Sequence, residues 1–319
     1  MKLRIVFFIG ISLLLLTGLS FVVKQAANQP PTEQQDAIVY LPIVPTSNNR
    51  LVVEATVDGG KSGYFALDSG GSSKLLIDSA FFYKNVDTSG LVEVRPRGKM
   101  YYWHTYYEGN VNVSIGYHSF NVSHIEVREW LPVHDGSNIV GIIGEEPFLD
   151  KITVINFQEN KIAFVDSLQI DSSYHAIPFL RYAGLVEGAK NQRFISIGGF
   201  SDKKGNKKSG KFSFDTGNGL TGVLLQSSFA DDLDLSTKRV DDLKETSFLR
   251  WEEDLIIGND LLATKVPVRR YRKDAVDIFS EHKESNGLIG MPLLKRYNII
   301  ADYKNDVLYL KPINIFYQE

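Results

Sequence analysis

The stretch from Tyr64 to Ser73 reads YFALDSGGSS and contains two residues that could carry chemistry. Ser69 offers a hydroxyl that could act as a nucleophile, and Asp68 offers a carboxylate that could act as a general base. An apolar run leads into the pair, as expected of a strand that ends at a loop. Which of the two atoms reacts depends on the partners that the rest of the chain provides.

A second stretch, GKFSFDTGN at residues 210–218, repeats the same pattern. Asp68 and Asp215 lie 147 residues apart, and the segments GIIG (141–144) and GLIG (287–290) lie 146 apart. Other β-like segments also recur in the same order in both halves. The sequence therefore predicts an internal repeat of two similar halves. A near match, DTSG at 87–90, follows no apolar strand and is interpreted as a turn.

The repeat decides between serine and aspartate. A serine nucleophile needs a histidine base with an acid behind it, and the first histidine of the chain is His104. The second copy replaces Ser69 by Thr216 but keeps the aspartate and the following glycine. What the two copies share is Asp-hydroxyl-Gly, so the serine reading is set aside.

Two carboxylates brought face to face share one proton, because two adjacent negative charges are costly. The charged one can then activate a water molecule, and the protonated one can donate to a substrate carbonyl. An internal repeat can supply both carboxylates from related loops. Small glycines after each hydroxyl residue allow close approach, and the hydroxyls can hydrogen-bond the opposite loop.

On these motifs the chain resembles a bilobal, pepsin-like aspartic protease of bacterial type, built from two retropepsin-like halves. The likeness covers about residues 38–312, including the strand-turn-strand endings FLDKITVINFQENKIAF and LLKRYNIIADYKNDVLYL. It implies Asp68 and Asp215 as the catalytic pair. The supporting residues that it implies are Ser69, Gly70, Thr216, Gly217, Ile143, Gly144, Ile289 and Gly290.

The resemblance also implies a substrate flap in the first half, at KMYYWHTYY (99–107). The candidates are Tyr101, Tyr102, Trp103 and Tyr106, with ordinary aromatic packing as the alternative. The chain departs from the family pattern after each glycine, where Gly71 and Asn218 replace Ser or Thr. Loss of a hydrogen-bond donor raises a carboxylate's pKa, so we expect the pair to titrate higher than in acid proteases.

The expected fold is all-β, with two related acid-protease-like β-barrel lobes and an interlobe cleft, preceded by one N-terminal apolar helix. The expected lobes are residues 37–170 and 171–319. Short helices are expected near 78–83, 146–151 and 292–296, and 25–36 is interpreted as a linker.

The N-terminal 24 residues predict a signal-anchor or a signal peptide. Residues 5–23 carry no charge and follow Lys2 and Arg4. A run of 19 residues is close to the roughly 20 that span a membrane and exceeds the about 7–15 of a cleaved signal. The body is therefore expected to be exported (periplasmic or extracellular), anchored by residues 5–23 if they are uncleaved and secreted otherwise.

Composition limits the possible partners. The net charge of −3 gives no electrostatic reason to bind nucleic acid, and the absence of cysteine excludes thiol chemistry and disulfides. The six histidines show no metal-ligand spacing, so no metal and no cofactor are expected. The expected partner is a peptide or protein substrate, and the chain is expected to be a monomer.

These observations predict an aspartic endopeptidase that hydrolyses exported proteins or peptides through a water activated by the two aspartates. The alternative is a noncatalytic, protease-like peptide-binding protein of the cell envelope. The missing hydroxyl after each glycine favours the alternative, and the retention of both aspartates opposes it.

Overall fold

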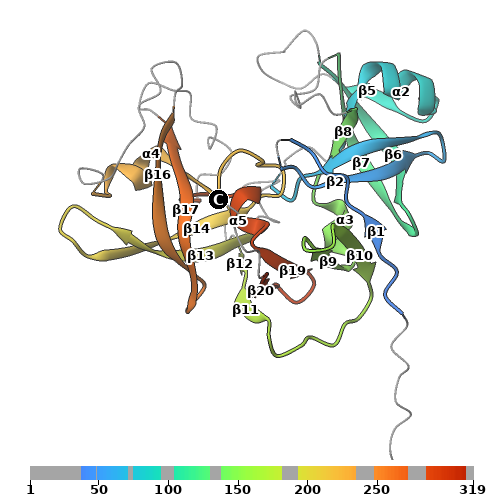
Figure 1. The fold of residues 1–319 in the computed structure, drawn as a ribbon. Helices are drawn as coiled ribbons and strands as arrows, with labels where there is room; N and C mark the ends of the chain where they lie inside the picture. The colour runs from blue at the N-terminus through green and yellow to red at the C-terminus, as the bar shows by residue number, and fades with distance from the viewer. Residues whose placement is uncertain are drawn as a thin grey trace, which may run out of the picture. The chain divides into compact units, whose positions relative to one another are not determined.

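The computed structural model describes residues 37–47, 49–70, 75–94, 104–129, 138–181, 193–234, 248–271 and 285–313 (Figure 1). Residues 38–319 form one compact unit. The predicted apolar helix at 5–23 and the linker at 25–36 lie outside the described residues. Within the described ranges, no helix is both long enough and apolar enough to span a membrane.

A first barrel is built from the N-terminal half of the chain. Its sheet has the order β2-β3-β8-β4-β7-β6-β5, and pairing of β2 with β6 closes six of the strands into a ring. Side chains alternate along β2: Val53, Ala55 and Val57 are buried in the main core, while Glu54 is exposed. The strands are β2 (Val52–Val57), β3 (Ser62–Leu67), β4 (Leu75–Asp78), β5 (Val92–Val94), β6 (His104–Ile115), β7 (His118–Arg128) and β8 (Ile139–Ile143).

A second barrel is built from the C-terminal half in the same way. Its order is β12-β13-β14-β18-β15-β17-β16, and pairing of β13 with β16 closes six strands. Figure 1 labels β13, β14, β16 and β17 of this barrel. The strands are β12 (Leu180–Arg181), β13 (Arg193–Ser201), β14 (Lys207–Phe214), β15 (Val223–Leu225), β16 (Phe248–Ile257), β17 (Leu261–Tyr271) and β18 (Gly287–Ile289). The all-β prediction with two barrels is thus confirmed.

The two barrels share one arrangement of three strands. In the first, β8 lies between β3 and β4, parallel to β3 and antiparallel to β4. In the second, β18 lies between β14 and β15 with the same two directions. The strand that runs into each predicted catalytic loop is therefore held by the apolar segment that follows about 75 residues later.

A third sheet, which the sequence analysis did not anticipate, combines both halves. It has six strands in the order β1-β10-β9-β19-β20-β11, and β9 and β19 join the halves through the pair Ile155 and Ile299. β9 and β19 carry apolar side chains on both faces of the sheet. Each face is covered by a different buried cluster, one with Ile155 and Ile299 and the other with Val154 and Ile300. The strands are β1 (Leu41–Pro42), β9 (Ile152–Asn156), β10 (Lys161–Val165), β11 (His175–Pro178), β19 (Tyr297–Asp302) and β20 (Val307–Pro312). The predicted lobe boundary at 170/171 lies between β10 and β11.

Four short helices are described: α2 (Ser79–Asn85), α3 (Glu146–Leu149), α4 (Ser227–Asp231) and α5 (Met291–Leu294). The three predicted helices correspond to α2, α3 and α5, and α4 was missed. Asp78 caps α2 by accepting a hydrogen bond from the backbone N–H of Phe81 at 3.0 Å. Gln226 precedes α4 without a side-chain cap, so the sequence carried no start signal there.

His118, at the start of β7, is a buried histidine whose protonation we expect to affect the stability of the fold. Its ring packs 4.6 Å from the ring of Phe164 and is only 5% exposed. Burial lowers the pKa of His118, the charge of Lys151 adds to this, and the Pro147 carbonyl opposes it. Asp150 and Asp166 also oppose the shift.

Acidification is therefore expected to destabilise the protein through His118. The unfolded chain takes up this proton near pH 6.5 but the folded chain resists it, so stability falls as the pH drops below about 6.5. His118→Phe should make the free energy of unfolding, measured in urea at pH 7.5 and 5, less dependent on pH. The control is His124→Gln, whose histidine is 63% exposed; an equal change in that variant would contradict the assignment.

Candidate functional site

Two loops begin directly after equivalent strands of the two barrels. Asp68 follows β3, and Asp215 follows β14. The backbone N–H of Asp68 donates to the carbonyl of Ile143 at 2.8 Å, and that of Asp215 donates to the carbonyl of Ile289 at 3.0 Å. The ends of β8 and β18 therefore fix the starting points of the two loops.

The structure brings the two aspartates together. A Cβ built on Gly217 would lie 2.3 Å from Cγ of Asp68, and one built on Gly70 would lie 2.9 Å from Cγ of Asp215. The charge of Asp68 acts on the carboxyl group of Asp215. Each carboxylate thus lies against the glycine of the opposite loop, where any larger residue would collide with it.

Ser69 and Thr216 hold the two loops together. The hydroxyl of Ser69 donates to the carbonyl of Phe214 at 2.9 Å and accepts from the N–H of Thr216 at 3.1 Å. The hydroxyl of Thr216 donates to the carbonyl of Leu67 at 2.7 Å and accepts from the N–H of Ser69 at 3.0 Å. These four hydrogen bonds form a near-symmetric lock between the two barrels.

The carboxyl group of Asp215 is strongly perturbed. Burial, the charge of Asp68 and the hydrogen bond to Asp68 raise the pKa of Asp215 well above its ordinary value. The N–H groups of Gly217 and Asn218 donate to its Oδ1 at 2.9 and 3.0 Å and act in the opposite direction. The arrangement therefore favours a proton on Asp215 beside an ionised Asp68.

Gly71 and Asn218 follow the two close-approach glycines, Gly70 and Gly217, and only Asn218 is described by the structure. Gly71 lies outside the described residues. The side chain of Asn218 accepts from the N–H of Leu220 at 3.3 Å, and its buried Nδ2 has no hydrogen-bond partner within the described part of the chain. Asn218 thus supports Asp215 through its backbone and not through its amide group.

The supporting glycines lie where the loops are packed most tightly. A Cβ on Gly290 would lie 2.3 Å from the carbonyl oxygen of Thr221 and 2.5 Å from that of Asn218. Gly144 follows β8 directly and is buried. Neither contacts a carboxylate in these interactions, so their role in the site is structural support.

Of the flap candidates, only Tyr106 is described; Tyr101, Tyr102 and Trp103 lie outside the described residues. Tyr106 belongs to β6 and faces Glu126 of β7, and His104 faces Arg128 two residues further along. These four residues, which we call the hairpin cluster, lie on the paired strands β6 and β7, next to the end of the β5–β6 pairing at Val94 and Tyr106.

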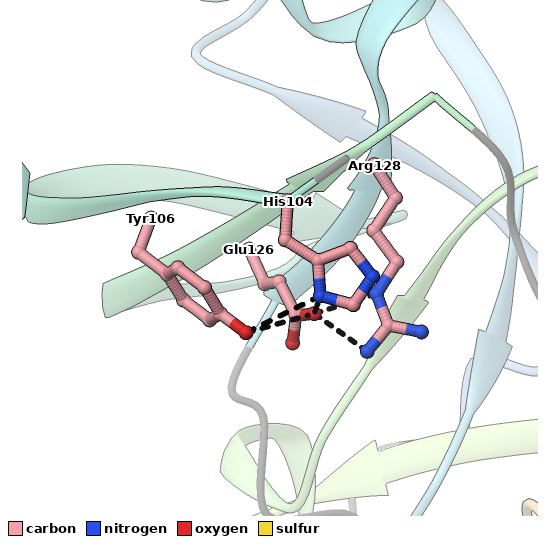
Figure 2. Close-up of polar contacts among 4 residues, drawn as sticks. All are labelled: His104, Tyr106, Glu126 and Arg128. Atoms are coloured by element: carbon pink, nitrogen blue, oxygen red, sulfur yellow. Dashed lines mark hydrogen bonds and ion pairs between the residues drawn. The ribbon is translucent and has the colours of Figure 1, made fainter. Parts of the chain in front are cut away.

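The hairpin cluster converges on one carboxylate oxygen, as Figure 2 shows. Oε1 of Glu126 lies 2.8 Å from Nδ1 of His104 and 2.5 Å from Nη2 of Arg128, and accepts from the Tyr106 hydroxyl at 3.4 Å. Burial and Arg128 lower the pKa of His104, while Glu126 opposes them. Glu126 and Arg128 were not predicted from the sequence; the signal for them is the spacing of polar residues at alternate positions of two adjacent strands.

Glu126→Gln is expected to destabilise the protein by about 1–3 kcal/mol, because it leaves the partly buried Arg128 without its counter-charge. Urea unfolding at pH 7.5 measures the change. Glu93→Gln, on an exposed position of β5, is the control and should change stability by less than about 0.5 kcal/mol. Equal effects of the two variants would show that the hairpin cluster contributes little.

The described residues contain no group of three or more histidine, aspartate or glutamate side chains that could hold a metal ion. What the site offers instead is a carboxylate pair that can exchange protons.

Comparison with known proteins supports the fold through structure and not through sequence. The crystal structure of an aspartic proteinase from Irpex lacteus superposes with a TM-score of 0.58 at 16% sequence identity. The match covers 88% of this chain and 99% of the other. No family model matches the sequence, and no curated protein matches it. The chain therefore has the bilobal fold of a pepsin-like aspartic proteinase.

Proposed function

We propose that this protein is an aspartic endopeptidase. The observation that carries the proposal is the carboxylate pair of Asp68 and Asp215, held on mutually locked loops with the pKa of Asp215 raised by burial and by Asp68. The fold shared with an aspartic proteinase adds support but does not by itself give an activity.

In the proposed reaction, Asp68 takes a proton from a water molecule as the water oxygen bonds to the carbonyl carbon of the peptide. Asp215 gives its proton to the carbonyl oxygen, and a tetrahedral diol results. The C–N bond then breaks, Asp68 passes its proton to the leaving nitrogen, and Asp215 recovers a proton from the diol. Burial assigns the two roles. Asp215 is 8% exposed and keeps its proton as the acid, whereas Asp68 is more accessible and acts as the base.

The proposed substrates are exported proteins or peptides. The support is the uncharged run at 5–23 behind Lys2 and Arg4, which is typical of an exported chain. An extended substrate backbone would pair with strand edges beside the two loops.

Cleavage of a diverse peptide mixture, read by mass spectrometry from about pH 3 to 8, tests the proposal, since this range brackets plausible titrations of the pair. Products formed by the wild-type protein and lost in both Asp68→Asn and Asp215→Asn would support it. No cleavage by a folded protein, together with retention of specific peptides, would favour the noncatalytic binding protein. The Nδ2 group of Asn218, which has no hydrogen-bond partner among the described residues, also favours it.

A further inference from the structure

Arg193 is a largely buried cation of the second barrel that the proposed reaction does not use. It is the first residue of β13, and its side chain is only 11% exposed. In the sheet it pairs directly with Arg181 of β12, so two positive residues lie opposite one another. A guanidinium group withdrawn from water in this way needs carboxylates and other acceptors around it.

The first barrel and the third sheet provide these acceptors. Nη1 of Arg193 lies 3.7 Å from Oε2 of Glu145, the second residue after β8 of the first barrel. Its Nε lies 3.5 Å from Oδ1 of Asp306, and its Nη2 donates to the backbone carbonyl of Tyr303 at 3.4 Å. Asp306 and Tyr303 belong to the turn between β19 and β20 of the third sheet. One side chain therefore contacts two other parts of the fold. We call Arg193, Glu145 and Asp306 the arginine clamp.

The first-barrel end of the arginine clamp lies beside the support of Asp68. Glu145 comes two residues after Ile143, whose carbonyl accepts from the N–H of Asp68 at 2.8 Å. The carbonyl of Glu145 accepts from the N–H of Phe148 at 2.9 Å, so its backbone is tied to α3. A displacement of Glu145 would therefore move the start of the Asp68 loop, two peptide units away.

The second-barrel end of the arginine clamp lies beside the strand that leads to Asp215. Phe194, the residue after Arg193, pairs with Ser213 of β14. Asp215 comes two residues after Ser213. The ion pair of Arg193 with Glu145 thus joins the backbone support of one aspartate to the backbone support of the other.

We propose that Arg193 is a positioning residue: through Glu145 it holds the two barrels at the spacing at which Asp68 and Asp215 share one proton. The inference rests on the proposed function for its catalytic meaning. Its structural content, control of the distance between the two carboxyl groups, does not depend on peptidase activity.

Arg193→Met keeps an unbranched apolar stem and removes the charge and the donors. The charge of Asp68 helps to raise the pKa of Asp215, and a wider spacing would weaken that effect. We expect the higher of the two apparent pKa values of the pair to fall by about half to one pH unit. Carboxyl-carbon NMR titration, assigned with Asp68→Asn and Asp215→Asn, measures this without any substrate.

The sign of the change separates positioning from a simple effect of charge. Loss of a positive charge by itself makes carboxylates harder to ionise, so a purely electrostatic role of Arg193 would raise the pKa values of the pair. Glu145→Gln opens the same ion pair from the other side and should also lower the higher value. A rise or no change in Arg193→Met would overturn the inference.

Arg181→Met is the matched control. Arg181 also pairs with Asp306, at 2.5 Å, but its side chain is 59% exposed. Within the described part of the chain it makes no ion pair with the first barrel. Its variant should change the titration of the pair by less than about 0.2 pH unit. A change as large as that of Arg193→Met would show that the spacing does not depend on the contact with Glu145.

Arg193→Lys covers the case in which Arg193→Met does not fold. Lysine keeps the charge, but a single ammonium group cannot replace the three nitrogens that contact Glu145, Asp306 and Tyr303. We expect the higher pKa of the pair to fall here too, by a smaller amount. A titration identical to that of the wild type would overturn the inference, because only the geometry has changed.

Peptide cleavage tests the catalytic meaning separately. If the wild-type protein cleaves peptides, kcat of Arg193→Met should fall about tenfold with KM changed less than about twofold. An unchanged kcat would overturn the positioning role. The expected titration in a protein that cleaves nothing would support the structural inference while the proposed function fails.

Discussion

Asp215→Asn is expected to lower the rate of peptide cleavage by about 10³-fold or more, within the range that positioned acid–base groups contribute. The amide oxygen can still accept from the N–H groups of Gly217 and Asn218, so the loop should keep its shape. What is lost is the proton that the reaction gives to the substrate carbonyl. Initial rates on a peptide that the wild-type protein cleaves measure the effect.

The same variant should be more stable than the wild type near neutral pH. The pKa of Asp215 is raised in the folded state, so the unfolded chain ionises first as the pH rises, and the folded state loses stability above the unfolded pKa of about 3.9. An amide carries no such penalty. We expect a gain of about 1–3 kcal/mol in the free energy of unfolding at pH 7, shrinking towards pH 3.

Asp87→Asn is the matched control, because Asp87 belongs to the sequence DTSG but lies in an exposed turn, where it accepts from the N–H of Ser89. Its variant should keep full activity. An Asp215→Asn protein that cleaves at the wild-type rate would contradict the proposed reaction. One that loses stability at pH 7 would contradict the buried, shared-proton description of the pair.

Gly217→Ala is expected to have the second largest effect. The new methyl group would lie 2.3 Å from Cγ of Asp68 and 2.4 Å from its Oδ2, whereas carbon atoms in contact stay roughly 3.5–4.0 Å apart. The carboxylate must therefore move by more than about 1 Å. We expect cleavage to fall about 10²-fold or more and stability to fall by about 1–3 kcal/mol.

Gly90→Ala is the control for Gly217→Ala, because a Cβ at Gly90 meets no atom within 4 Å. A further comparison isolates the collision. In an Asp68→Ala background the methyl group has room, so the stability lost through Gly217→Ala should shrink. An unchanged loss in that background would show that the strain arises elsewhere in the loop.

Much of the candidate site was predictable from local sequence. The repeat of Asp-hydroxyl-Gly, each followed about 75 residues later by an apolar segment ending in glycine, predicted which residues lie near one another. Alternating apolar residues, as in β2, predicted strands with one buried face. These patterns are local or repeated, so they can be recognised in the sequence without knowing which strands pair.

The contacts of the hairpin cluster could not be predicted from local sequence patterns. Tyr106 stays a predicted flap residue, and its hydroxyl donates to Glu126, twenty positions later, a contact that the sequence did not predict. Which polar side chains oppose one another depends on the register of β6 and β7, and register is set by the whole sheet. The sequence alone contained the residues but not their pairing.

The all-β class, the two related halves and the pairing of Asp68 with Asp215 could be predicted from the sequence, because its repeated segments mark equivalent positions. The third sheet, in which β9 and β19 join the halves, is evident only in the folded protein. The turn between β19 and β20 places the ring of Tyr303 on that of Phe148 in α3. The physical reason is that such contacts join segments more than a hundred residues apart, through packing that no local periodicity encodes.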